Sequence, residues 1–124
     1  MKEMAEFLCG GSWTSSLDGE DDGRFELHVE SNGQITGDHF LPPDGTEILP
    51  VRGTCIHSPN HHIEIRETRN GRNFRYHARI IPDPTGGDEH KLQDGRRSRM
   101  ANDEREKDKK DNQDDEVWTG THST

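Results

Sequence analysis

The sequence predicts an all-β protein, an antiparallel up-and-down β-barrel of about eight strands. Apolar residues alternate with polar ones along most of the first 81 positions, which is the period of half-buried strands. Two Asn-Gly pairs, 32–33 and 70–71, stand between such runs and indicate hairpins. The connections are short, which favours antiparallel neighbours, and closure into a barrel removes the exposed edges of an open sheet.

Each strand rests on a local pattern. Phe25, Leu27 and Val29 alternate with charged neighbours in the second strand. Pro50 lies near the start of the fourth, where a missing N–H is tolerated. The fifth and sixth flank the second Asn-Gly pair, and little helix is expected anywhere. The predicted strands are about 12–18, 24–31, 34–41, 48–57, 61–67 and 73–81, with a weak seventh at about 89–100 and a short eighth at about 116–122.

The core predicted from composition is thin. Only 20 of the 124 residues are Leu, Ile, Val or Phe, and they cluster before residue 82. We expect one domain over 1–124, in which 102–116 is a mobile charged loop or a short solvated helix, because this segment has eight acidic and four basic residues and no aliphatic ones. The acidic pair Asp21 and Asp22 lies in a turn-rich stretch, so we expect both carboxylates to be exposed and ordinary.

Charge and cysteine usage limit the partners and the compartment. A net charge of −9 repels nucleic acids and anionic membranes, so neither is expected as a partner. No apolar run has the length of a membrane span or of a secretory signal, so we expect a soluble, cytoplasmic protein. Cys9 and Cys55 are then expected to be free thiols, although one disulfide is the alternative for an exported chain.

Three stretches carry a family resemblance. LCGGSWTSSLDG, NGQITGDH and LPVRGTC, over about residues 8–55, together resemble the avidin family within the wider lipocalin-like (calycin) group of barrels. DDEVWTGT, around Trp118, is similar to the acidic loop and tryptophan near the end of avidins. The resemblance implies a non-catalytic barrel that binds a small organic ligand.

Departures from the family pattern bear on the ligand. By motif position, Ser15 stands where the family has Asn, and His39 stands where it has Tyr; both still form hydrogen bonds. The other pocket tryptophans of the family have no counterparts, so we expect biotin binding to be largely lost. Together with Tyr76 of the sixth strand, the candidate ligand-binding residues are Trp13, Ser15, His39, Tyr76 and Trp118.

Several interpretations stay open at this stage. Trp13 either plugs one end of the barrel, beside Trp118 on the joint between first and last strands, or forms a wall of a ligand site. Trp118 lies either on the last strand or on a loop. Arg75, His77 and Arg79 alternate with apolar neighbours and are expected on a solvated outer face; pointing inward, they would form an anion site.

A cluster of Cys55, His57, His61 and His62 has ligand types suited to zinc or copper, but its spacing fits no standard site. We therefore expect polar residues of a solvated hairpin and no bound metal. No nucleophile, phosphate-loop or metalloprotease motif is present, so no enzyme activity and no cofactor are expected. The sequence supports two functions: a small-ligand-binding barrel, or an interaction or oligomerisation module whose barrel is filled by its own side chains.

Overall fold

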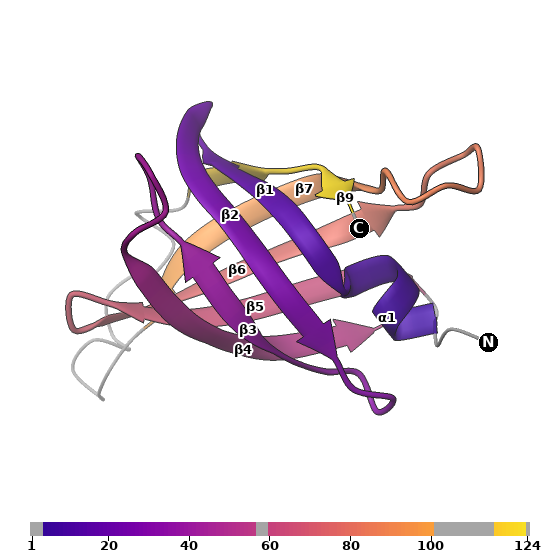
Figure 1. The fold of residues 1–124 in the computed structure, drawn as a ribbon, viewed down its shortest axis with the longest axis horizontal. Coiled ribbons are helices and arrows are strands. Elements are labelled where there is room, and N and C mark those ends of the chain that lie inside the picture. The colour runs from indigo at the N-terminus through magenta and orange to yellow at the C-terminus, as the bar shows by residue number, and fades with distance from the viewer. Residues whose placement is uncertain (1–3, 57–59, 101–115, 124) are drawn as a thin grey trace.

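Nine strands form one closed sheet, preceded by a short helix, in the computed structural model of the chain (Figure 1). The structure describes residues 4–56, 60–100 and 116–123. The elements are α1 (Met4–Cys9), β1 (Gly11–Leu17), β2 (Glu20–Val29), β3 (Gln34–Phe40), β4 (Ile48–Ile56), β5 (His62–Arg69), β6 (Arg72–Ile81), β7 (Lys91–Met100), β8 (Glu116–Thr119) and β9 (His122–Ser123). The predicted charged loop lies outside the described residues, except for Glu116.

Closure of the barrel occurs at a seam where β8 and β9 both pair with β1, which also pairs with β2. Trp118 is opposite Leu17, and His122 is opposite Trp13. The two short strands behave as one closing strand interrupted at Gly120, where a Cβ atom would lie 2.2 Å from the Thr14 carbonyl oxygen. The up-and-down barrel is confirmed, and Trp118 lies on a strand.

The two Asn-Gly turns differ. Asn70 and Gly71 both have positive φ, 54° and 76°, in the two-residue hairpin between β5 and β6, as predicted. Between β2 and β3, Gly33 has φ 89°, and its N–H donates to the Glu30 carbonyl at 2.9 Å. The β2–β3 connection is therefore a four-residue turn from Glu30 to Gly33, and not the two-residue turn that the sequence predicted.

The second strand begins at Glu20, earlier than predicted, because Asp18 and Gly19 form a further tight hairpin with φ values of 51° and 83°. Its pairing with β1 shifts register between Thr14 and Ser16. Gly23, with φ 80°, lies at this irregularity, and a Cβ there would lie 1.9 Å from the Phe40 carbonyl oxygen. The bulge changes which side chains face inward and turns Asp22 into the barrel.

Helix α1 was not predicted, and it covers the end of the barrel at the right of Figure 1. It places Cys9 against the inward-facing Cys55 of β4, with the two Cα atoms 6.3 Å apart, and the sulfurs form a disulfide. The expectation of free thiols is therefore wrong. The sequence does not reveal the pairing because it depends on where an unexpected helix places Cys9.

The barrel is filled by inward side chains, of which the largest fully buried ones are Trp13, Trp118, Tyr76 and Phe25. Trp13 and Trp118 lie on the same seam but at different levels of the barrel. Trp13 is near the start of β1, opposite His122 of β9, whereas Trp118 is opposite Leu17 at the end of β1. The expectation that both lie at one end is wrong.

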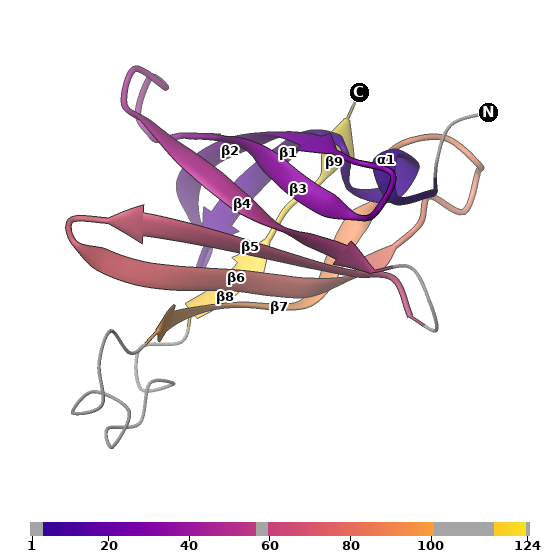
Figure 2. The ribbon, with the colours of Figure 1, turned by 90° about the horizontal axis from the view of Figure 1, so that it is seen from below.

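The wall made by β4, β5, β6 and β7 is seen in Figure 2. Along β6, Tyr76, Ala78 and Ile80 are buried, whereas the side chain of Arg79 is 53% exposed. Arg75 and His77 share the outward phase of Arg79, so the prediction of a solvated outer face is confirmed. Among the described residues, no helix has the length and apolarity needed to cross a membrane.

Candidate functional site

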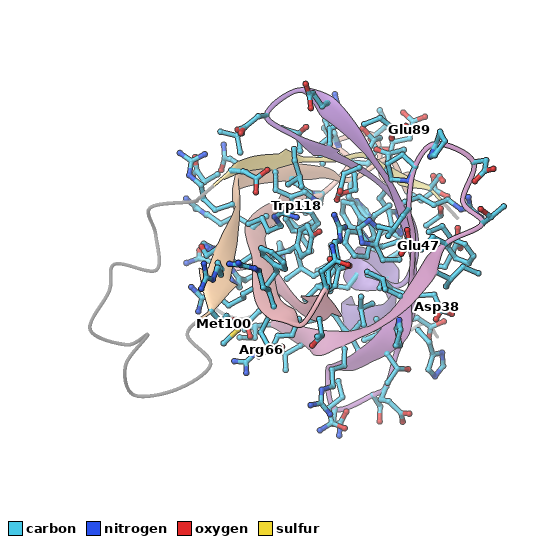
Figure 3. All side chains as sticks on the ribbon, turned by 90° about the vertical axis from the view of Figure 1, so that its left-hand side faces the viewer. Asp38, Glu47, Arg66, Glu89, Met100 and Trp118 are labelled. Carbon is cyan, nitrogen blue, oxygen red and sulfur yellow. A yellow bond between two sulfur atoms is a disulfide. The ribbon has the colours of Figure 1, made fainter. Side chains whose placement is uncertain are left out.

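A cluster of polar side chains fills the end of the barrel opposite α1. Ser15, His39 and Tyr76 reach it from β1, β3 and β6, and Trp118 from β8. Figure 3 looks into this end, and Trp118 lies inside the ring of strands. We call the following set the internal network: Ser15, Asp22, His39, Glu67, Arg69, Tyr76 and Trp118.

Ser15 joins the seam to β2. Its hydroxyl donates to the Asp22 carboxylate at 2.8 Å and accepts from the Trp118 indole N–H at 3.0 Å. Ser15 and Trp118 are each 1% exposed. The hydroxyl therefore has both its donor and an acceptor position occupied by protein.

His39 lies fully buried between two carboxylates. Its Nδ1 contacts the Glu67 carboxylate, and its Nε2 lies 2.6 Å from the Asp22 carbonyl oxygen and 3.4 Å from the Asp22 carboxylate. Burial alone would lower the pKa of His39, but the hydrogen bonds to Asp22 and Glu67 raise it to about 9. The ring is thus an imidazolium at neutral pH, stacked on Phe25 with centroids 4.1 Å apart.

Asp22 is held as a carboxylate by its partners. Burial would raise its pKa, but His39, Ser15 and Arg69 hold the pKa below its ordinary value. The residue is 5% exposed, so the expectation that it is an exposed, ordinary acid is wrong. The bulge at Gly23 is the physical reason, because it reverses the side to which Asp22 points.

Arg69 and Tyr76 complete the internal network. The Arg69 guanidinium lies 3.2 Å from the Glu67 carboxylate and 3.4 Å from that of Asp22. The Tyr76 hydroxyl donates to Glu67 at 3.1 Å, and burial together with these carboxylates raises its pKa. Two carboxylates balance one imidazolium and one guanidinium, so the internal network is electrically neutral.

Sequence reasoning missed Asp22, Glu67 and Arg69. Glu67 and Arg69 continue the inward phase of Ile63 and Ile65 along β5. The sequence therefore had a signal for these two residues: a Glu and an Arg occupy positions of β5 where the alternation predicts inward-facing side chains. For Asp22 there was no comparable signal, since its phase depends on the bulge.

Trp13 lies apart from the other four predicted residues. Its indole N–H donates to the Cys9 carbonyl at 2.9 Å, and its ring centroid lies 4.9 Å from that of His122. His122 stacks on His90, also at 4.9 Å. Burial and the neighbouring His122 lower the pKa of His90. Trp13 thus closes the α1 end, whereas Ser15, His39, Tyr76 and Trp118 meet at the opposite end.

The cysteine and histidines considered as metal ligands form no metal site as far as the structure describes them. Cys55 is bonded to Cys9, and His57 lies outside the described residues. His62 stacks against His77 on the outer face, with centroids 6.1 Å apart. Within the described ranges, no group of three or more His, Cys, Asp or Glu side chains is arranged to hold a metal ion.

Comparison with known proteins identifies the fold. The structure matches the crystal structure of xenavidin with a TM-score of 0.63 and 15% sequence identity, over 94% of this chain and 99% of that chain. The chain has an avidin-like fold. No protein-family model and no curated protein matches the sequence.

Two hollows lie along β4–β7 of this avidin-like barrel, and the first reaches past the outer face, because the inward-facing Val51, Glu67 and Phe74 help to line it. One, of about 490 Å³, is lined by Pro50, Val51, Arg52, Arg66, Glu67, Thr68, Asn73, Phe74 and Met100. The other, of about 620 Å³, is lined by Asn60, His62, His77, Ala78, Arg79 and Asp94. Neither hollow is lined by any of the five predicted ligand-binding residues. Both hollows have the volume of a ligand site, and Glu67 of the internal network lines the first.

Proposed function

We propose that this avidin-like barrel is a non-catalytic interaction module, filled by its own side chains, that works through the outer face of β4–β7. The observation that carries the proposal is the closure of the internal network on itself. Both nitrogens of His39 have protein partners, and the Ser15 hydroxyl is bonded on both sides. A ligand entering there would have to displace buried ion pairs, which is costly.

The same arrangement argues against catalysis. The Ser15 hydroxyl donates to Asp22 and not to an imidazole, so it is not activated by a neutral base. His39, with its pKa of about 9, is a charged donor at neutral pH and does not accept a proton from a substrate. Ser15 and His39 are thus engaged with other members of the internal network and are not placed to exchange a proton with a substrate.

The partner is either another protein or a further copy of the chain. A chain with few apolar residues gains stability by association, which favours an assembly role. Sedimentation velocity over a range of protein concentrations separates the two, because self-association raises the sedimentation coefficient with concentration.

A thermal-shift screen of small organic molecules, biotin included, tests where the protein binds. Each hit is measured again with Ser15→Ala in the internal network and with Thr68→Ala on the outer wall. We expect hits to be lost with Thr68→Ala and kept with Ser15→Ala. A ligand that needs Ser15 and not Thr68 would overturn the proposal in favour of an interior site.

That interior site is the second candidate function, a small-ligand-binding barrel with its biotin site largely lost. It is favoured by the Nε atoms of Arg69 and Arg97, which are buried and have no hydrogen-bond partner among the residues that the structure describes. The Arg97 guanidinium lies 4.3 Å from the centroid of the Phe74 ring. An anionic ligand that reached these two arginines would supply the missing acceptors.

A further inference from the structure

The smaller hollow on the β4–β7 wall is lined by cations, by apolar surface and by one carboxylate, Glu67, which is paired with His39 and Arg69. Arg52 of β4 and Arg66 of β5 are directly opposite each other in the sheet, and both line the hollow. Thr68 and Asn73 add a hydroxyl and an amide, and they are bonded to each other at 2.7 Å. Pro50 and Met100 supply apolar lining. Figure 3 shows Arg66 and Met100 on the outside of the barrel wall.

The arginines form a row that crosses three strands. Arg52 pairs with Arg66, and Arg66 pairs with Arg75 of β6. Like charges placed opposite each other destabilise a sheet. Glu64 offsets part of this repulsion, since its carboxylate lies 3.0 Å from Arg66 and 3.8 Å from Arg75. Arg52 has no ion pair within the part of the chain that the structure describes.

The row continues into a larger basic face. Arg79 of β6 and Arg96 of β7 also point outward, and Arg79 lies 4.0 Å from the Asp94 carboxylate. The outer surface of β4–β7 therefore has more arginines than carboxylates, on a chain whose net charge is −9. A local charge opposite to that of the whole molecule marks this wall as electrostatically distinct.

We propose that the hollow binds an acidic segment of a partner protein, with a carboxylate held between Arg52 and Arg66. The guanidinium groups present paired donors that match a carboxylate, and Thr68 offers a further polar contact. An apolar side chain next to the acidic one packs on Pro50 and Met100. This inference rests on the proposed function and names the chemistry of its partner.

Two other occupants fit the surface less well. A second copy related by a two-fold axis would place this arginine row against itself, and like charges would face each other. A nucleic acid would be repelled by the net charge over its whole length, and the aromatic ring that lines the hollow, Phe74, is partly buried with the Arg97 guanidinium 4.3 Å from its centroid. A short acidic peptide avoids both penalties.

Fluorescence anisotropy with the full chain tests the proposal. The probe is a fluorescein-labelled peptide that repeats Glu-Leu-Ser, compared with a Gln-Leu-Ser peptide and with oligothymidylate of equal charge. We expect the acidic peptide to bind, and Arg52→Gln/Arg66→Gln to weaken its binding about tenfold. The control Arg24→Gln/Lys91→Gln changes the net charge equally, away from the hollow, and should weaken binding less than about twofold.

Three results would overturn the inference: equal loss in both double variants, tighter binding of oligothymidylate, or equal binding of the neutral peptide. Circular dichroism confirms that each variant is folded. Should no peptide bind while the small-molecule hits still depend on Thr68, the acidic partner is wrong and the outer-face function stands. Small-molecule hits that depend on Ser15 instead would contradict the proposed function itself.

Discussion

At the scale of single residues, the internal network decides how the barrel interior behaves. Its two carboxylates and His39 are almost completely removed from water, the Arg69 side chain is 23% exposed, and the charges cancel only as a set. Buried ion pairs are expensive to form, but removing one member is worse, because it leaves an uncompensated charge. The residues of this set are therefore coupled, and each depends on the others.

Glu67→Gln should destabilise the protein by about 3 to 5 kcal/mol, because His39 and Arg69 would then face a single carboxylate. The measurement is urea unfolding followed by tryptophan fluorescence. Glu64→Gln is the matched control: its partner Arg66 lies on the outer face with its side chain 54% exposed, so about 0 to 1 kcal/mol is expected. Equal effects of the two variants would contradict the importance given to the internal network.

His39 also makes stability depend on pH. Its pKa rises from 6.5 to about 9 on folding, so the stabilisation is complete below about pH 6.5 and is lost as the pH rises through 9. The free energy of unfolding should fall by about 3 kcal/mol over that window. Asp22, with its lowered pKa, acts in the opposite direction, and its stabilisation is lost as the pH falls below 3.8. A flat profile of urea midpoints from pH 6 to about 9.5 would contradict this assignment, and His39→Gln should remove the alkaline decline.

At the scale of elements, the disulfide fixes α1 to β4 across 46 positions of sequence. Closing a loop of this length stabilises a fold by roughly 4 kcal/mol in the chain-entropy account. Cys9→Ser/Cys55→Ser should lower stability by about that amount, and reductant should have no effect on this variant. Thiol titration of the denatured, unreduced chain should find no thiols; two thiols would contradict the bond. Disulfides are typical of oxidising compartments, and the cytoplasmic location expected from the sequence stays a prediction.

The closing strand gives a second prediction at this scale. Trp118 lies on β8, is 1% exposed, and contacts Tyr76 with ring centroids 5.3 Å apart. Trp118→Ala and Trp13→Ala should each cost about 3 to 5 kcal/mol, because each leaves a large cavity in the core. Differential scanning calorimetry of both variants checks this. A mild Trp118→Ala would mean that β8 adds little to closure.

The strands and the helix show which elements the alternation of apolar residues predicts and which it does not. Alternation of apolar residues located β2 to β6, because each has one buried and one wet face. It failed at Asp22, where a bulge reverses the phase, and at α1, where six residues are too few for a helical pattern. Alternation indicated Tyr76, whereas Ser15 and His39 came from the family resemblance; all three are buried. The contacts of His39 with Glu67 and Arg69 join β3 to β5, so no local pattern predicts them.

At the scale of the whole molecule, the barrel divides its charges between two regions. Inside, the four ionised groups of the internal network cancel. Outside, the β4–β7 wall has an excess of arginine on an acidic chain. A barrel with a neutral, filled interior and a polarised wall is suited to recognition at its surface.

Biotin binding is the last test at this scale, because it shows whether the interior of the barrel can admit a ligand. A ureido group needs donors and acceptors in the wall of its site, but the Ser15 hydroxyl and both His39 nitrogens are occupied within the protein. Opening the site would bring buried charges against a neutral ureido group, at a cost that one or two new hydrogen bonds do not offset. We therefore expect no change in melting temperature with biotin at micromolar concentration. A large upward shift, lost in Ser15→Ala, would show instead that the internal network rearranges around the ligand and that the avidin-like fold retains an interior site.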